Sequence, residues 1–93
     1  MFVGILTLEL SIHEAASLKD KRMVVNSMLD RIRARFNVSA AQIDNHDLWR
    51  SATLAVAVVS NERRNTEMVL NHVRDLAESE VRCDITGCHV EIL

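Results

Sequence analysis

The sequence contains no proline, no tyrosine and only two glycines, Gly4 and Gly87, among its 93 residues. Flexible linkers are rich in glycine and proline, so their scarcity excludes a linker and predicts a single domain, residues 1–93, whose elements are joined by short polar turns. The two glycines also stand 83 residues apart, which excludes a glycine-rich phosphate-binding loop.

Long apolar runs and export signals are missing as well. No segment approaches the roughly 20 apolar residues that cross a bilayer. Residues 1–12 are apolar, but they carry Glu9 and lack both a basic start and a small-residue cleavage site, so they do not resemble a signal peptide. We therefore expect a cytoplasmic protein without a membrane partner, in which Cys83 and Cys88 remain free thiols.

Apolar residues make up 48% of the chain and charged residues 26%, which is typical of a globular domain. Residues 2–12 alternate strictly and predict a strand. Residues 37–43 predict a short second strand. Residues 52–60 are apolar on both faces, which is typical of a central strand covered on both sides.

Two amphipathic helices follow the first and third strands. Ser17 and Asp20 resemble a capping box and predict that the first helix runs from Leu18 to Arg35. Asn61 is the predicted cap of the second helix, which runs to about Glu78. The apolar stripes that identify these helices are Leu18, Val25, Met28, Leu29, Ile32 and Phe36 in the first, and Thr66, Val69, Leu70, Val73, Leu76 and Ala77 in the second.

The last predicted strand, residues 81–93, changes its alternation part-way. A shift of one residue would turn every later side chain to the other face of the sheet, so one extra residue must be absorbed. We predict a bulge or kink at Thr86–Gly87. The apolar positions that change parity are Val81, Cys83 and Ile85 before this point and Cys88, Val90 and Ile92 after it.

The order of elements, β-α-β-β-α-β, predicts an α+β ferredoxin-like fold. Its four-stranded antiparallel sheet would have the order 4-1-3-2, with both helices on one face. The two central strands of that order are also the two most apolar ones.

The first helix is basic within an acidic chain. Six cations against two carboxylates give it a charge of +4, whereas the rest of the chain carries −6. Such an asymmetry can direct binding to the phosphates of RNA. The cations flank the apolar stripe on both sides, however, so an ordinary solvated helix is the alternative, and Lys21 lies closest to that stripe. The candidate nucleic-acid-binding residues are Lys19, Lys21, Arg22, Arg31, Arg33 and Arg35.

The sheet face turned away from the helices would be apolar and free of aromatic rings. The pattern therefore does not favour base stacking on this face, because RNA-binding sheets of this kind display aromatic side chains. An uncovered apolar face instead predicts an interface with a second copy, as in a homodimer, or with another protein. The candidate interface residues are Val3, Ile5, Ala55, Ala57 and Val59.

The sequence carries only weak signals for a catalytic or metal-binding site. His46 next to Asp47 is the most enzyme-like pair, but adjacent residues rarely orient each other and no nucleophile stands at a diagnostic spacing. Cys83, Cys88 and His89 lack a second pair of zinc ligands, so buried thiols are the expectation. We expect no catalytic residue, no metal and no cofactor. Trp49 is predicted to anchor the connection around His46 against the core or a partner.

Four segments resemble the YlxP-like family of small bacterial proteins, a domain family of unknown function. They are "FVGILTLEL", "SLKDKRMVVNSMLDRIRARFNVS", "DLWRSATLAVAVVSN" and "VEIL". The resemblance implies a ferredoxin-like fold, a cytoplasmic location and no established enzyme activity. It also implies a link to ribosome assembly or translation, because members are often encoded beside ribosome-binding factor A. The family's basic positions fall on Lys19, Lys21, Arg22, Arg31 and Arg35, and its "DLW" on Asp47, Leu48 and Trp49.

The sequence therefore predicts a non-enzymatic binding module. The first hypothesis is docking onto ribosomal RNA or a ribosome-assembly factor through phosphate contacts from the basic helix. The alternative is a protein–protein adaptor or homo-oligomeric module that uses the open sheet face. An enzyme built on the His46 region is the third and weakest hypothesis.

Overall fold

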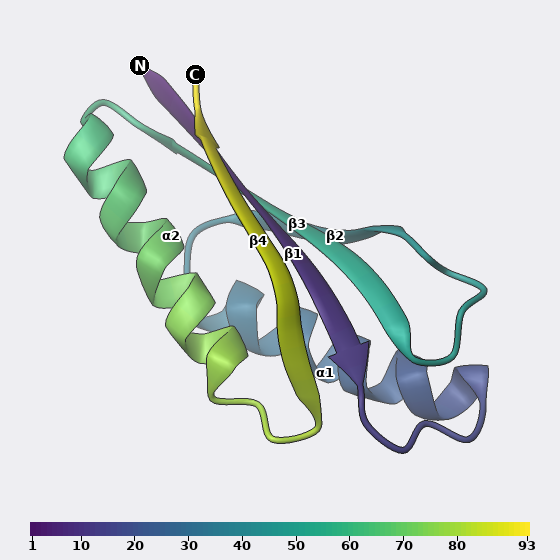
Figure 1. Cartoon of the computed structure of the whole chain (residues 1–93). Coiled ribbons are helices and arrows are strands. Elements are labelled where there is room, and N and C mark those ends of the chain that lie inside the picture. Colours follow the sequence, from purple (N-terminus) through teal and green to yellow (C-terminus); the bar gives the residue numbers. More distant parts are fainter.

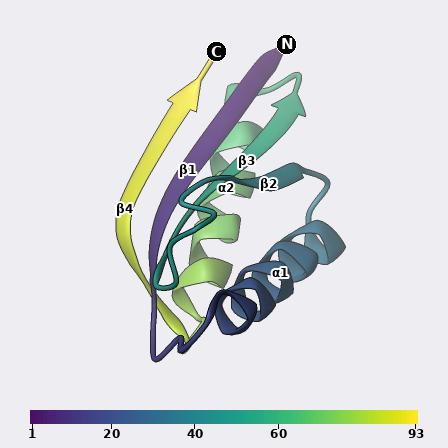
Figure 2. The same cartoon turned by 90° about the vertical axis from the view of Figure 1, so that its right-hand side faces the viewer.

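A computed structural model describes all 93 residues. Four strands form one antiparallel sheet in the order β2-β3-β1-β4, and both helices lie on the same side of it (Figures 1 and 2). This confirms the predicted strand order and the ferredoxin-like α+β fold. The elements are β1 (Phe2–Ile12), α1 (Leu18–Arg35), β2 (Ser39–Asp44), β3 (Ser51–Ser60), α2 (Arg63–Glu78) and β4 (Cys83–Ile92).

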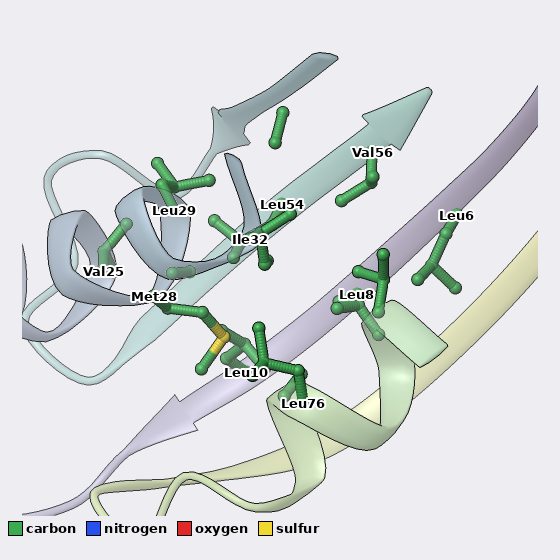
Figure 3. Packing of buried hydrophobic residues seen from close by; sticks show 14 of the residues in the cluster. Leu6, Leu8, Leu10, Val25, Met28, Leu29, Ile32, Leu54, Val56 and Leu76 are labelled. Carbon is green, nitrogen blue, oxygen red and sulfur yellow. The ribbon is translucent and has the colours of Figure 1, made fainter. Parts of the chain in front are cut away.

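The core lies between the sheet and the two helices. In the register of β1 and β3, Leu6 stands opposite Val56 and Leu8 opposite Leu54, and all four side chains are buried. In Figure 3, Leu54 lies beside Ile32 of α1, and Leu8 lies next to α2. The alternation of the strands and the apolar stripes of the helices thus meet in one layer. Burying a leucine of this kind contributes about 1.5–3 kcal/mol.

The predicted N-terminal cap is confirmed for α1 but not for α2. At the start of α1, Ser17 Oγ accepts a hydrogen bond from the Asp20 amide at 3.1 Å, and the Asp20 carboxylate accepts one from the Ala16 amide at 3.1 Å. At the start of α2, the predicted Asn61 cap is wrong, because the cap position is Glu62. No side chain caps the first-turn amides of α2. Ser60 Oγ accepts a hydrogen bond from the amide of the cap residue Glu62 at 3.1 Å.

The predicted bulge lies where the parity of β4 changes. Gly87 stands opposite Glu9, whereas Ile85 stands opposite Leu10, so Thr86 is the extra residue. Its hydroxyl donates to the Glu9 carbonyl at 3.2 Å. The bulge therefore returns the apolar residues of the second half of β4 to the helix-facing side of the sheet.

Gly4 allows α2 to pack closely on β1. A Cβ atom at this position would lie 2.2 Å from Thr66 Cγ2 and 2.9 Å from Leu70 Cδ1. We predict that Gly4→Ala pushes α2 away from the sheet and lowers the free energy of unfolding by about 1–3 kcal/mol. Urea unfolding measures this, and a variant as stable as the wild type would contradict it. Thr66→Ser, which removes the clashing methyl group, should recover part of the loss when combined with Gly4→Ala.

The molecule is elongated, with principal extents of 43 × 20 × 17 Å. Figure 1 shows both termini side by side at one end, where β1, β3 and β4 extend past α1. Leu93 and Val3 exchange backbone hydrogen bonds there, at 3.0 and 2.8 Å. No helix of the chain combines the length and apolarity needed to span a bilayer.

Candidate interaction surfaces

Lys21 differs most from the other five cations of α1, because its side chain is completely buried. Its ammonium group donates to three backbone carbonyls of the connection between β2 and β3: those of Asn45, of Leu48 at 2.5 Å and of His46 at 3.4 Å. Burial lowers the pKa of Lys21 below its usual value. The group is occupied inside the protein, so the prediction that Lys21 contacts RNA is wrong.

Lys21, and not Trp49 as the sequence suggested, anchors the connection between β2 and β3 to the core. Trp49 and Leu48 are each 52% exposed, so neither side chain anchors the loop in the core. Asn45 adopts a left-handed conformation, with φ of 65°, and its side chain donates to Thr53 Oγ1 at 3.0 Å. The only sequence signal for this arrangement was the position of Lys21 beside the apolar stripe.

Arg31 belongs to an ion cluster instead of a free basic surface. Its guanidinium lies 2.5 Å from the carboxylate of Glu80, whose side chain is only 6% exposed. Glu80 also accepts from Arg82, at 2.7 Å from Nε and 3.0 Å from the backbone amide. The hydrogen bond from Arg82 is the main reason that the pKa of Glu80 falls to about 2. Arg31 thus holds α1 against the segment before β4.

Arg33 is also engaged within the fold. Its guanidinium donates to the Ala40 carbonyl of β2 at 2.5 Å and lies 3.8 Å from the carboxylate of Asp30. Of the six candidate residues, Lys19, Arg22 and Arg35 are exposed and have neither a hydrogen-bond nor an ion-pair partner. Lys19 and Arg35 are separated by about 24 Å along the helix axis. The structure therefore leaves scattered cations, not one continuous basic track.

The open face of the sheet brings the five candidate interface residues together. The register places Val3 opposite Val59 and Ile5 opposite Ala57, with Ala55 next along β3. No helix covers this side of the sheet (Figure 2). Val59 is 65% exposed, and the other four side chains are partly exposed. The result is a contiguous apolar surface, which we call the open-face patch: Val3, Ile5, Ala55, Ala57 and Val59.

The residues considered for catalysis or metal binding remain apart. His46 and Asp47 are exposed on the loop that Lys21 holds. No three His, Cys, Asp or Glu side chains converge closely enough to hold a metal ion. Cys83 is buried, which raises its pKa to about 11, whereas Cys88 is exposed. The expectation that both thiols are buried is therefore wrong for Cys88, which lies in the uncovered half of β4.

The two cysteines should differ sharply in reactivity. We predict that one equivalent of thiol reacts quickly with an aromatic disulfide reagent in the native protein, and that the second reacts only after unfolding, because Cys83 is buried and protonated. Cys88→Ser should abolish the fast phase and leave the slow one. Two fast thiols in the native wild type would contradict the placement of Cys83.

The family model described as "Protein of unknown function (DUF503)" matches residues 3–90. The chain belongs to this family. The DUF503 chain is also 36% identical over 77 residues to "Uncharacterized protein YlxP" of Bacillus subtilis (strain 168). The aligned region covers 83% of this chain and 84% of that protein. Both findings confirm the resemblance to YlxP-like proteins, and neither printed description states an activity.

Two solved structures resemble the fold of this DUF503 protein. A de novo designed protein with the ferredoxin fold, solved by NMR, has a TM-score of 0.59 at 10% identity and covers 100% of this chain and 84% of its own. The de novo designed protein Foldit4 has a TM-score of 0.54 at 9% identity, with 100% and 97% covered. At such low identity these matches show the fold alone.

Proposed function

We propose that this protein is a non-catalytic module that binds another protein through the open-face patch. The observation that supports the proposal is the patch itself: five adjacent apolar side chains on two central strands, covered by no helix. Uncovered apolar surface that is contiguous typically marks a contact with a partner. The small side chains Ala55 and Ala57 make the centre of the face flat, which suits another sheet or a helix.

A charge at the centre of the patch tests this proposal. Ala57→Glu should leave the fold intact, because position 57 is partly exposed on the open face, and should abolish capture of the partner from a bacterial lysate. Met23→Glu is the matched control, since Met23 is 61% exposed on α1, away from the patch. The proposal requires the same partner protein to be held by wild type and Met23→Glu and lost with Ala57→Glu. Equal capture by all three proteins would refute it.

Phosphate binding is the second candidate function, because Lys19, Arg22 and Arg35 present cations that no carboxylate of the chain neutralises. Three phosphate contacts would give a slope of about −2 to −3 in a plot of log affinity against log salt. Replacing all three with glutamine should remove that dependence for ribosomal RNA. Arg64→Gln on α2 is the control for general loss of charge, and a flat salt response in the wild type would exclude this function.

A further inference from the structure

We propose that the free edge of β4 pairs with β4 of a second copy, so that two four-stranded sheets form one continuous eight-stranded sheet. The occupant of the edge is thus another molecule of this chain. The inference goes beyond the proposed function, because it uses the edge of the sheet and not its open face. Three observations support it: unpaired backbone groups, a self-complementary charge pattern and exposed apolar side chains.

The backbone groups on the outer side of β4 have no partner. Leu93 exchanges hydrogen bonds with Val3 of β1, and in an antiparallel ladder every second residue makes such bonds. The amide and carbonyl groups of Cys88, Val90 and Ile92 must therefore point away from β1. An exposed edge of this kind is usually blunted by proline, lysine or a covering segment. The strand from Gly87 to Ile92 has no proline or lysine, and β4 is the last strand of the sheet.

The charges of β4 select one register for the pairing. A two-fold axis perpendicular to the sheet pairs residues that share a face. The axis must therefore lie midway between one residue and the same residue of the second copy, and we name it by that residue. An axis at His89 would pair His89 with itself, and an axis at Glu91 would bring two carboxylates together. An axis at Val90 pairs His89 of each copy with Glu91 of the other. Two carboxylates directly opposite each other are destabilising, whereas an imidazole N–H can donate a hydrogen bond to a carboxylate. An axis at Val90 is therefore favoured over an axis at His89 or Glu91.

The same register buries the apolar side chains that the single chain leaves exposed. Val90 is 44% exposed and would stand opposite its own copy, while Cys88 would stand opposite Ile92. All three lie on the helix-facing side of the sheet, opposite Leu8, Leu6 and Gly4 of β1. Val90 and Ile92 line a hollow of about 330 Å³ there, together with Arg63, Glu67 and Asn71 of α2. A second β4 would cover the open side of this hollow.

The register can be tested by breaking and restoring its charge pairs. By sedimentation equilibrium, the wild type should be a dimer. His89→Glu places two carboxylates opposite each other at both ends of the pairing and should raise the dissociation constant about tenfold or more. Adding Glu91→Lys to His89→Glu should restore the dimer, because each pair then joins a carboxylate to an ammonium group. A monomeric wild type, or a dimer indifferent to His89→Glu, would overturn the inference.

A cross-link tests the position of the axis directly. In a Cys88→Ser background, Val90→Cys should form an interchain disulfide on mild oxidation, because hydrogen-bonded partners in antiparallel strands have Cα atoms about 5.5 Å apart. Ile92→Cys in the same background should not cross-link, since it faces the serine. Ala57→Glu should leave the dimer intact. If Ala57→Glu dissociates the dimer, the copies meet through the open-face patch and the edge inference is wrong.

Discussion

Lys21→Met will release the connection between β2 and β3 and lower the free energy of unfolding by about 2 kcal/mol. Methionine keeps the length and apolar character of the buried stem, but the carbonyls of Asn45, His46 and Leu48 lose their common donor. Hydrogen bonds from a charged group contribute about 1.5–3 kcal/mol each. Removing a buried charge recovers its desolvation cost, and the partly exposed carbonyls can take up water, so the net loss is smaller than the sum.

The loss should be visible as local opening as well as reduced stability. Hydrogen exchange of the backbone amides from Asn45 to Trp49 should accelerate more than that of the β1 and β3 amides. Lys19→Met is the matched control, because Lys19 lies on the same helix in solvent, and its effect should stay within about 0.5 kcal/mol. Unchanged exchange in the loop of the Lys21 variant would show that the three hydrogen bonds do not hold it.

Glu80→Gln will destabilise the protein by about 3 kcal/mol near neutral pH. The carboxylate receives hydrogen bonds from Arg31 and Arg82 while almost fully buried, and an uncharged amide cannot balance either guanidinium. The size follows from the pKa, which folding lowers from 4.5 to about 2, at 1.36 kcal/mol per pKa unit. Removing one member of a buried ion cluster leaves the others unpaired.

The pH dependence of this loss has a defined direction. Because the folded pKa is depressed, the contribution of Glu80 is complete above about pH 4.5 and disappears as the pH falls through about 2. The difference in unfolding free energy between wild type and Glu80→Gln should therefore be constant from pH 5 to 7 and shrink toward zero in acid. Glu78→Gln is the control, since its pair with Arg74 is half-exposed, at 3.2 Å. A difference that persists unchanged at pH 2 would contradict the assignment.

The contacts of Lys21 and Arg31 explain why the positive charge of α1 does not mark a binding surface. Lys21 and Arg31 count as positive charges in a composition, yet one holds a loop 24 or more residues away and the other an acidic group 49 residues away. Periodicity cannot reveal such contacts, because they depend on which loops the fold brings to the helix. Half of the cations of α1, Lys21, Arg31 and Arg33, are thus engaged within the structure, so the charge of the helix supports RNA binding less than the sequence alone suggests.

The fold was predictable because each element carries a local signal. The alternation of residues 2–12 predicts β1, and the change of parity in the last strand predicts the bulge observed at Thr86–Gly87. The predicted start of α2 differs from the observed one by one residue, since the cap position is Glu62 and not Asn61. The open-face patch was also predictable, because the strand order and alternation together decide which side chains face away from the helices.

The edge of β4 carries a signal that the sequence pattern did not make obvious. His89 and Glu91 are two positions apart, so they share a face of the strand and become cross-strand partners only when an axis lies at Val90. The significance of this spacing depends on β4 being a free edge, which follows from the sheet order. A dimer formed in this way would also place two open-face patches on one sheet, which would double the surface available to a partner.

The most direct test of the account is a side-by-side capture experiment with three proteins: wild type, Ala57→Glu, and the variant in which Lys19, Arg22 and Arg35 are all glutamine. Each is used to capture partners from a bacterial lysate, with and without nuclease treatment. We expect that the wild type and the triple glutamine variant hold the same protein and that Ala57→Glu does not. Capture that is lost with the triple variant or after nuclease treatment, and kept with Ala57→Glu, would contradict it and assign the function to the exposed cations of α1.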